Sequence, residues 1–229
     1  KFETDFQIME QKSYERSPLN TIKRLPKRGL YDQDTIFGIL DQQFICHIAW
    51  EDRGQPYMIP TAYGRQGDTL YIHGSSKSRM ISALADGRPL CLVVTLLDGL
   101  VLARSVFHHS MNYRSAVIYG NGREVEGEEK MEALRLITEQ ILPGRWDEAR
   151  LPNDIEMKAT SVLAISIDTA SAKIRTGPPI DDEEDYELPI WAGILPVETT
   201  YGQPITDPGM KSDLPLSDSV VQRLKQKES

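Results

Sequence analysis

The sequence is poor in the features that mark several common classes of protein. Its 229 residues include two cysteines, Cys46 and Cys91, whose spacing suits neither a zinc motif nor a disulfide framework, so we expect reduced core residues. No stretch approaches the roughly 18 apolar residues that a membrane-spanning helix needs. The first residues carry acids where a secretory signal would carry an apolar run. We therefore expect a cytoplasmic protein.

Positive charge is also scarce. The chain has 34 acidic residues against 26 lysines and arginines, a formal net charge of −8. Nucleic acids and anionic membranes attract proteins through broad cationic surfaces, so neither is expected as a partner. Any site for an anion must instead be a local cluster of cations.

The common nucleotide and hydrolase motifs are missing. A P-loop would need glycine at the positions of Tyr71 and Ser76, ahead of Lys77 and Ser78. A dinucleotide fingerprint beginning at Gly120 fails where Val125 stands, and no G-x-S-x-G elbow occurs. These gaps exclude the familiar nucleotide folds and give a hydrolase nucleophile no support.

A metal site is not expected either. His108 and His109 are adjacent, and neighbours on a strand point to opposite faces. The chain offers no third ligand at a suitable spacing. The acid run 181–185 does not follow a calcium-loop pattern, and we expect it to be a solvated loop.

The apolar residues and turn signals predict a mainly β protein with flanking helices. About six strands up to residue 119, joined mostly by short turns, favour a closed antiparallel barrel over a doubly wound sheet, and one more strand is expected at 161–167. A hairpin is expected at Asp98-Gly99. We expect a lead-in over residues 1–30, one domain over 31–197, and a polar tail over 198–229 that is either disordered or an arm lying on a partner. The expected strands are 44–50, 56–63, 69–73, 89–97, 100–106, 113–119 and 161–167, and the expected helices are 32–42, 78–85 and 128–142.

The stretch HGSSKSRM, residues 73–80, directly follows a predicted strand. Its glycine permits a close backbone approach, its serine hydroxyls can donate, and Lys77 and Arg79 bring charge. Together these groups can satisfy a phosphate from several directions. A capped helix start with two solvated cations fits the same residues equally well. The local chemistry leaves both interpretations open.

Three longer stretches carry a resemblance that is more specific. They are PYMIPTAYGRQGDTLYIHGSSKSRMISAL, CLVVTLLDGLVLARSVFHHSMNYRSAVIYG and GPPIDDEEDYELPIWAGILPV. Their order and spacing over roughly residues 25–197 resemble the FMN-binding split-barrel superfamily. Within it, the chain is most similar to pyridoxamine 5′-phosphate oxidase-like proteins, including nitroimidazole-resistance flavoproteins.

This resemblance implies a six-stranded antiparallel split barrel that forms a homodimer, with two FMN molecules at the subunit interface. The implied contacts fall into three groups. The flavin phosphate would be held by His73, Gly74, Ser75, Lys77, Ser78 and Arg79, and the flavin ring would lie beside Ile59, Pro60 and Thr61. Further contacts would come from Arg114, Ser115 and Trp191, the first two from the second subunit. Each could have a plainer role, Arg114 pairing with an acid or Trp191 anchoring a core.

The implied function is an FMN-dependent oxidoreductase acting on a small organic molecule, in which the flavin supplies the chemistry. No catalytic side chain is assigned. The alternatives are a non-catalytic flavin-binding or sensing module and a haem-binding relative. Oxidation of vitamin B6 phosphates is doubtful, because true pyridoxamine-phosphate oxidases carry an arginine after the tryptophan, whereas here none follows Trp191 until Arg223.

Overall fold

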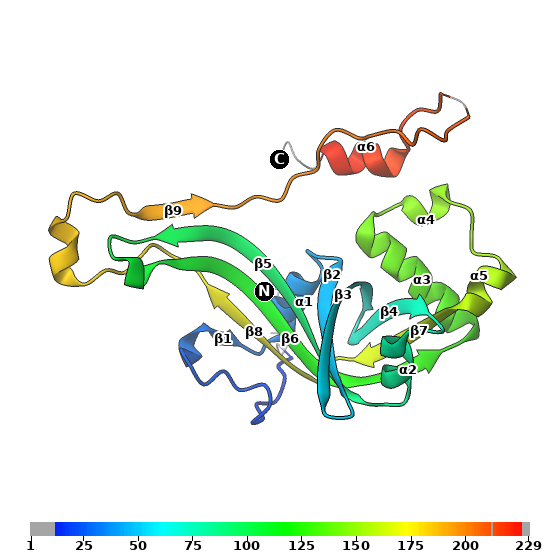
Figure 1. The fold of residues 1–229 in the computed structure, drawn as a ribbon, viewed down its shortest axis with the longest axis horizontal. Helices are drawn as coiled ribbons and strands as arrows, with labels where there is room; N and C mark the ends of the chain where they lie inside the picture. The colour runs from blue at the N-terminus through cyan, green and yellow to red at the C-terminus, as the bar shows by residue number, and fades with distance from the viewer. Residues whose placement is uncertain (1–11, 212, 226–229) are drawn as a thin grey trace, which may run out of the picture.

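A closed ring of six antiparallel strands forms the centre of the molecule. The computed structural model describes residues 12–211 and 213–225. Around the ring the order is β2, β3, β4, β7, β6, β5 and back to β2, and every neighbouring pair is antiparallel. The predicted mainly β barrel is confirmed (Figure 1). The strands are β2 Ile45–Asp52, β3 Gln55–Gln66, β4 Thr69–Ser75, β5 Pro89–Leu102, β6 Ser110–Val125 and β7 Thr160–Ser166.

Alternation along the strands fills the barrel. In β2 the side chains of Cys46, Ile48 and Trp50 are buried, whereas those of Ile45 and His47 lie on the exposed outer face. Each fully buried aliphatic side chain contributes about 1.5–3 kcal/mol relative to exposure. Burial also raises the pKa of the Cys46 thiol to about 12. A thiol with this pKa remains protonated at neutral pH.

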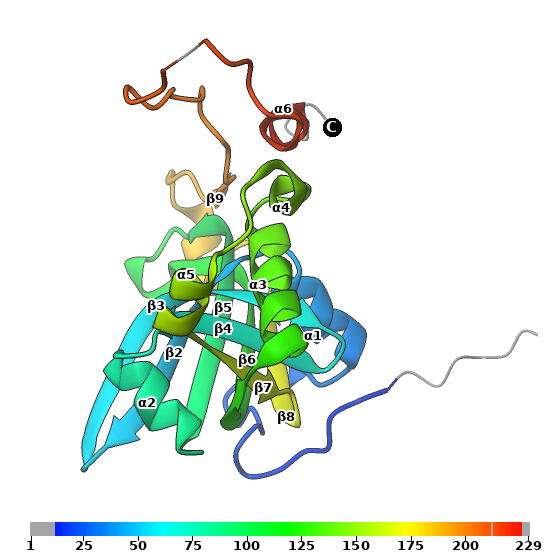
Figure 2. The same cartoon turned by 90° about the vertical axis from the view of Figure 1, so that its right-hand side faces the viewer.

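Helices cover the barrel where the strands present apolar faces (Figure 2). Helix α1 Gln33–Leu40 begins at Asp32, whose carboxylate accepts the N–H of Thr35 at 2.8 Å. Helix α3 Gly127–Ile141 packs across β3 and β4. Gly64 of β3 permits this approach, because a Cβ there would lie 2.6 Å from the backbone nitrogen of Ile137. Helix α2 Arg79–Ala85 follows β4, and α5 Asp154–Ala159 precedes β7.

Strands β5 and β6 continue beyond the barrel as a long arm (Figure 1). The predicted hairpin at Asp98-Gly99 is wrong, because β5 runs through both residues with a register shift between Leu97 and Gly99. A Cβ at Gly99 would lie 3.0 Å from Ile194 Cγ2, so this glycine serves close packing of β9 Gly193–Pro196. Two further strands escaped prediction: β8 Thr169–Arg175 pairs with β6, and β1 Gly29–Leu30 pairs with β8.

The chain reverses at the tip of the arm, through the 3-10 helix η2 Val106–His108. Asp181 accepts hydrogen bonds there from the backbone N–H of Arg104 at 2.9 Å and of Ser105 at 3.2 Å. Its carboxylate is buried and also pairs with the Arg104 guanidinium. Asp181 therefore differs from the solvated loop predicted for the acid run; residues Glu183–Glu187 form the 3-10 helix η3.

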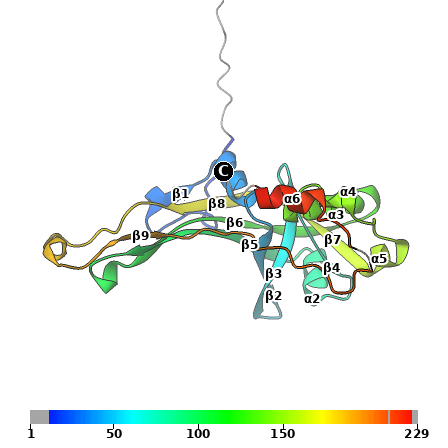
Figure 3. The same ribbon diagram turned by 90° about the horizontal axis from the view of Figure 1, so that it is seen from above.

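The C-terminal tail, residues 197–225 as far as they are described, returns along the barrel to α3 (Figure 3). It ends in α6 Asp218–Lys225, which the sequence did not predict. The backbone N–H of Ser219 donates to Glu148 at 2.8 Å, which attaches α6 to α4 Arg145–Glu148. A 3-10 helix, η1 Pro26–Arg28, precedes β1. No helix in the described part of the chain is long and apolar enough to cross a membrane.

Candidate functional site

The loop after β4, residues 75–79, is held by its own backbone. The N–H of Ser78 donates to the Ser75 carbonyl at 2.8 Å, and that of Lys77 donates to Ser75 Oγ at 3.3 Å. The N–H of Ser76 donates to the carbonyl of Ala159 at 3.0 Å, which attaches the loop to the end of α5. The side chains of Lys77 and Ser78 thus take no part in holding the turn. They are left available to a ligand.

Lys77 and Arg79 are exposed and have no carboxylate partner among the described residues. The Arg79 guanidinium lies 4.1 Å from the centre of the Tyr57 ring, and Tyr57 stacks on Trp50 with centroids 5.5 Å apart. Stacking on a ring face orients the guanidinium plane and leaves its N–H edges free to donate. Such a group suits bidentate binding of a phosphate.

Two other predicted residues of this loop have a structural role. Ser78 is the N-cap of α2, but its hydroxyl makes no capping bond and so remains free. A Cβ at Gly74 would lie 3.0 Å from Ile81 Cγ1, so α2 packs too closely on β4 for a larger residue. The glycine is explained by helix packing, independently of any ligand.

Two buried nitrogens near the loop have no hydrogen-bond partner within the described chain. They are Nδ1 of His73, in β4, and Nε1 of Trp50, in the aromatic stack below Arg79. Burial lowers the pKa of His73, because its charged form loses hydration. An unpaired buried donor or acceptor costs about 1–3 kcal/mol, so each is a place where a ligand or water would be favourable.

The predicted ring neighbours on β3 do not share one face. Thr61 and Ile59 are opposite Cys46 and Ile48 of β2 and therefore lie on the barrel side. Pro60 is opposite His47, on the outer face. A flat ring against one side of β3 can therefore contact Ile59 and Thr61 together, or Pro60, but not all three through their side chains.

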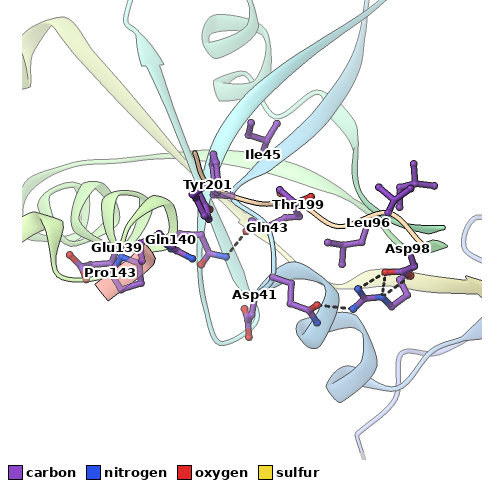
Figure 4. Close-up of a pocket in the computed structure, with 16 residues that line it drawn as sticks. Asp41, Gln43, Ile45, Leu96, Asp98, Glu139, Gln140, Pro143, Thr199 and Tyr201 are labelled. Atoms are coloured by element: carbon purple, nitrogen blue, oxygen red, sulfur yellow. Dashed lines mark hydrogen bonds and ion pairs between the residues drawn. The ribbon is translucent and has the colours of Figure 1, made fainter. Parts of the chain in front are cut away.

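A cavity of about 810 Å³ opens between the barrel, the end of α3 and the tail (Figure 4). Arg114 of β6 occupies one side. Its guanidinium donates to Asp98 at 2.7 Å and to Gln42 Oε1 at 2.7 Å. The hydrogen bond to Asp98 raises the pKa of Arg114 further. Arg114 is thus committed to an acid of its own chain, as the plainer sequence interpretation proposed.

The walls of this cavity come from six separate segments. They are the connection from α1 into β2, strand β5, strand β6, the end of α3, the start of the tail and α6. The lining residues are Asp41, Gln42, Gln43, Phe44, Ile45, Leu96, Leu97, Asp98, Arg114, Glu139, Gln140, Pro143, Val197, Thr199, Tyr201 and Arg223. No local pattern in the sequence indicates this set, because its members are scattered over about 180 positions.

Ser115 and Trp191 lie elsewhere. Ser115 is next to Arg114 on β6 and so faces the opposite side of the sheet, where its hydroxyl donates to the Lys173 carbonyl at 3.4 Å. Trp191 is 68% exposed and lies on the arm, its ring 3.0 Å from the place of a Cβ on Gly193. Their predicted contacts with a cofactor held between subunits stay predictions. Within one chain, the first group of predicted residues is brought together around the 75–79 loop.

Sequence reasoning missed several members of both regions. Tyr57 carries Arg79 on its ring, while Asp98 and Gln42 bind Arg114. Tyr57 could have been suspected, because it starts the stretch that bears the predicted ring neighbours. Asp98 was instead taken for a turn residue. For the described residues, no group of three or more histidines, cysteines or acids is placed to hold a metal.

The closed six-stranded ring defines a split-barrel protein, and the loop after β4 gives it a local cluster of cations. The family model for pyridoxamine 5′-phosphate oxidase matches residues 32–174, and the chain belongs to this family. No curated protein matches the sequence.

Three solved structures are similar to the chain. The flavocytochrome Anf3 of Azotobacter vinelandii is 39% identical, with a TM-score of 0.84 over 90% of this chain and 97% of its own. An FAD- and haem-binding protein of Mycobacterium smegmatis is 37% identical, with a TM-score of 0.82 over 86% of this chain and 97% of its own. A candidate 5-nitroimidazole antibiotic resistance protein of Bacteroides thetaiotaomicron is 26% identical, with a TM-score of 0.52 over 62% and 84%. The predicted relationship to split-barrel flavin-binding proteins is confirmed.

Proposed function

We propose that the protein is a flavin-dependent oxidoreductase in which the 75–79 loop binds the phosphate of FMN, or of the FMN part of FAD. The observation that carries this proposal is the pair of uncompensated cations, Lys77 and Arg79, in a chain of net charge −8. Neither cation has a carboxylate partner in the described chain, and the two lie within one short loop beside the free hydroxyl of Ser78. Clustering of unpaired charge with a free donor favours an anion from outside the chain.

The residues present fit a flavin nucleotide. Lys77, Ser78 and Arg79 would bind its phosphate, and Ile59 and Thr61 of β3 would lie beside its ring. The unpaired buried nitrogens of His73 and Trp50 lie on β4 and β2, the two strands that flank β3. The flavin, when bound, supplies the exchange of electrons with a small organic substrate. FMN was the sequence prediction, whereas the name of one similar structure includes FAD.

The same proposal includes a homodimer with the flavin between the subunits. The exposed apolar side chains of the arm and of the outer barrel face support it, among them Phe107 at 86% and Met58 at 63% exposure. Surfaces of this kind usually mark a protein interface. In such a dimer, Ser115 and Trp191 would reach the partner's flavin. Light scattering on the purified protein tests this part, and a monomeric mass would refute it.

A second candidate is a protein that binds flavin and haem together. The two similar structures at 37–39% identity favour it, because one is named a flavocytochrome and the other an FAD- and haem-binding protein. Haem iron needs an axial ligand such as histidine. His108 and His109 are engaged at the arm tip, with Asp182 and Ser105. His47 is exposed on β2 without a hydrogen bond in the described chain and would be the residue to hold the iron.

The absorption spectrum of the freshly purified protein tests both candidates. The proposal predicts the flavin bands, with FMN or FAD identified by chromatography after denaturation. A Soret band in addition would establish the second candidate. Bleaching of the flavin bands by a reduced nicotinamide, followed by reoxidation with a small organic acceptor, would demonstrate oxidoreductase activity. A colourless protein that binds neither added FMN nor FAD would refute the proposal.

A further inference from the structure

We infer that the cavity beneath the C-terminal tail binds an uncharged, flat ring compound. Its volume of about 810 Å³ lies in the range of pockets that bury a small organic ligand. Phe44, Leu96 and Tyr201 supply apolar and aromatic wall. The claim that this ligand exchanges electrons with the flavin rests on the proposed function. The claim that the cavity binds such a ligand does not depend on it.

The charges of the cavity disfavour an anion. Among the lining residues are three carboxylates, Asp41, Asp98 and Glu139, against two guanidinium groups, Arg114 and Arg223, which leaves a net charge of −1. An incoming anion would therefore be repelled by the net negative charge, and Arg114, which is held by Asp98, is not free to bind it.

Both arginines are already engaged. Arg114 pairs with Asp98 at 2.7 Å. Arg223 donates to the Ile141 carbonyl at 3.2 Å and lies over the Tyr201 ring at 5.3 Å. Two of the acids are likewise occupied: Asp41 pairs with Arg65, and Glu139 accepts the N–H groups of Gly144 and Trp146.

The remaining polar groups are neutral. Gln140 uses its amide N–H groups on the carbonyls of Leu40 and Gln43, which leaves its oxygen as an acceptor. The side chains of Gln43 and Thr199 make no hydrogen bond within the described chain. These amide and hydroxyl groups can orient a neutral ligand by hydrogen bonds, at a lower desolvation cost than a charged one would pay.

The cavity continues into a second, apolar hollow of about 300 Å³ under α6. Phe44, Tyr201 and Arg223 line both. Ile141, Val220 and Leu224 are among the residues that close the far end. A ligand with a polar end toward Gln43 and an apolar end toward α6 matches this arrangement.

The cavity adjoins the strand on which the flavin ring is proposed to lie. Ile45, in its wall, is paired across the sheet with Ala62, the residue after Thr61. Cross-strand partners have their Cβ atoms about 4.5–5.5 Å apart. Ile45 and Ala62 point to the outer face, whereas Thr61 points to the barrel side, so a compound bound there would lie across β3 from the proposed flavin ring.

Calorimetric titration of the purified full chain with two matched probes tests the inference. The probes are 4-nitrobenzamide, which is neutral, and 4-nitrobenzoate, which has nearly the same shape and one negative charge. We expect the amide to bind at least about tenfold more tightly, because the cavity lining has a net negative charge and its Arg114 is already paired with Asp98. Equal affinities, or tighter binding of the carboxylate, would overturn the inference.

Two substitutions locate the binding. Leu97→Trp adds bulk to a lining residue that is 42% exposed and should lower the affinity for the amide at least about tenfold. Val106→Trp, at the 85% exposed arm tip, is the matched control and should leave it unchanged. Circular dichroism and the unfolding midpoint show whether each variant folds. Unchanged affinity in a folded Leu97→Trp would place the probe elsewhere and overturn the inference.

Asp98→Asn is expected to increase the affinity for the charged probe, an effect that loss of folding cannot produce. It frees Arg114 and removes one carboxylate, so the affinity for 4-nitrobenzoate should rise about tenfold. No rise would overturn the charge argument. The flavin content of each sample, read from its absorption spectrum, is a separate measurement. Amide binding by a protein that takes up neither added FMN nor added FAD would refute the proposed function and leave the cavity site standing. A protein that binds flavin but not the amide would refute the cavity site and leave the proposed function standing.

Discussion

The 75–79 loop and the cavity under the tail both contain arginine, but they use it in opposite ways. In the loop, Arg79 stacks on Tyr57 and has no acid beside it. In the cavity, Arg114 is bound by Asp98 and Gln42. Arg79 therefore presents a positive charge without an acid partner, whereas the charge of Arg114 is neutralised by Asp98.

This difference indicates which ligand each region can accept. A free guanidinium stacked on a ring has its orientation fixed before an anion arrives, so little entropy is lost on binding. A guanidinium in an ion pair must first give up its acid. A count of arginines alone would not distinguish the two regions. The partners of each arginine decide the matter.

The largest effect is expected from Lys77→Ala combined with Arg79→Ala. Loss of two charge-assisted contacts, each worth about 1.5–3 kcal/mol, should weaken FMN by at least about a hundredfold and riboflavin, which lacks the phosphate, only slightly. Fluorescence titration of protein stripped of cofactor measures both constants. Arg123→Ala, which breaks the exposed pair with Glu129, is the matched control. Equal losses of affinity for FMN and riboflavin would show that the phosphate does not bind at this loop.

A smaller effect is expected from Tyr57→Leu. The substitution keeps an apolar residue on β3 but removes the ring beneath Arg79. An exposed cation–π contact is worth about 0.5–1 kcal/mol, so FMN affinity should fall about two- to fivefold. The same titration measures it. An effect as large as that of the double substitution would mean that the ring itself contacts the flavin.

Arg114→Ala should leave the ratio of FMN to riboflavin affinity unchanged. Its expected effect is on folding, since Asp98 loses a partner and the free energy of unfolding should fall by about 1 kcal/mol. Denaturant titration measures this. A marked fall in the FMN-to-riboflavin ratio would instead show that Arg114 leaves Asp98 for the flavin phosphate.

The smallest effect concerns pH. Burial lowers the pKa of His73 in the folded protein, whereas the unfolded chain has the ordinary value of about 6.5. Below about pH 6.5 the unfolded state therefore takes up a proton that the folded state resists, and stability is lost as pH falls. The free energy of unfolding, measured with urea at one pH above and one pH below about 6.5, should show this loss, and His73→Gln should reduce the loss. If the variant keeps the same pH dependence of stability, that dependence comes from other titratable groups.

Much of the barrel was predictable, because alternation and turn signals are local. The sequence also identified the 73–79 stretch, since its cations and hydroxyls are contiguous. The stacking of Arg79 on Tyr57 and the pairing of Arg114 with Asp98 were not predictable, because each joins residues at least 16 positions apart. The hairpin predicted at Asp98-Gly99 was wrong because of a contact that is likewise distant in the sequence. Its sequence is that of a turn, but packing of β9 against Gly99 keeps β5 continuous.

The 75–79 loop is proposed to bind the phosphate of a flavin. The most direct test is the affinity of the stripped wild-type protein for FMN compared with riboflavin, measured by fluorescence titration in one buffer. Two free cations and a serine hydroxyl predict that FMN binds at least about a hundredfold more tightly. Equal affinities for the two would contradict the account.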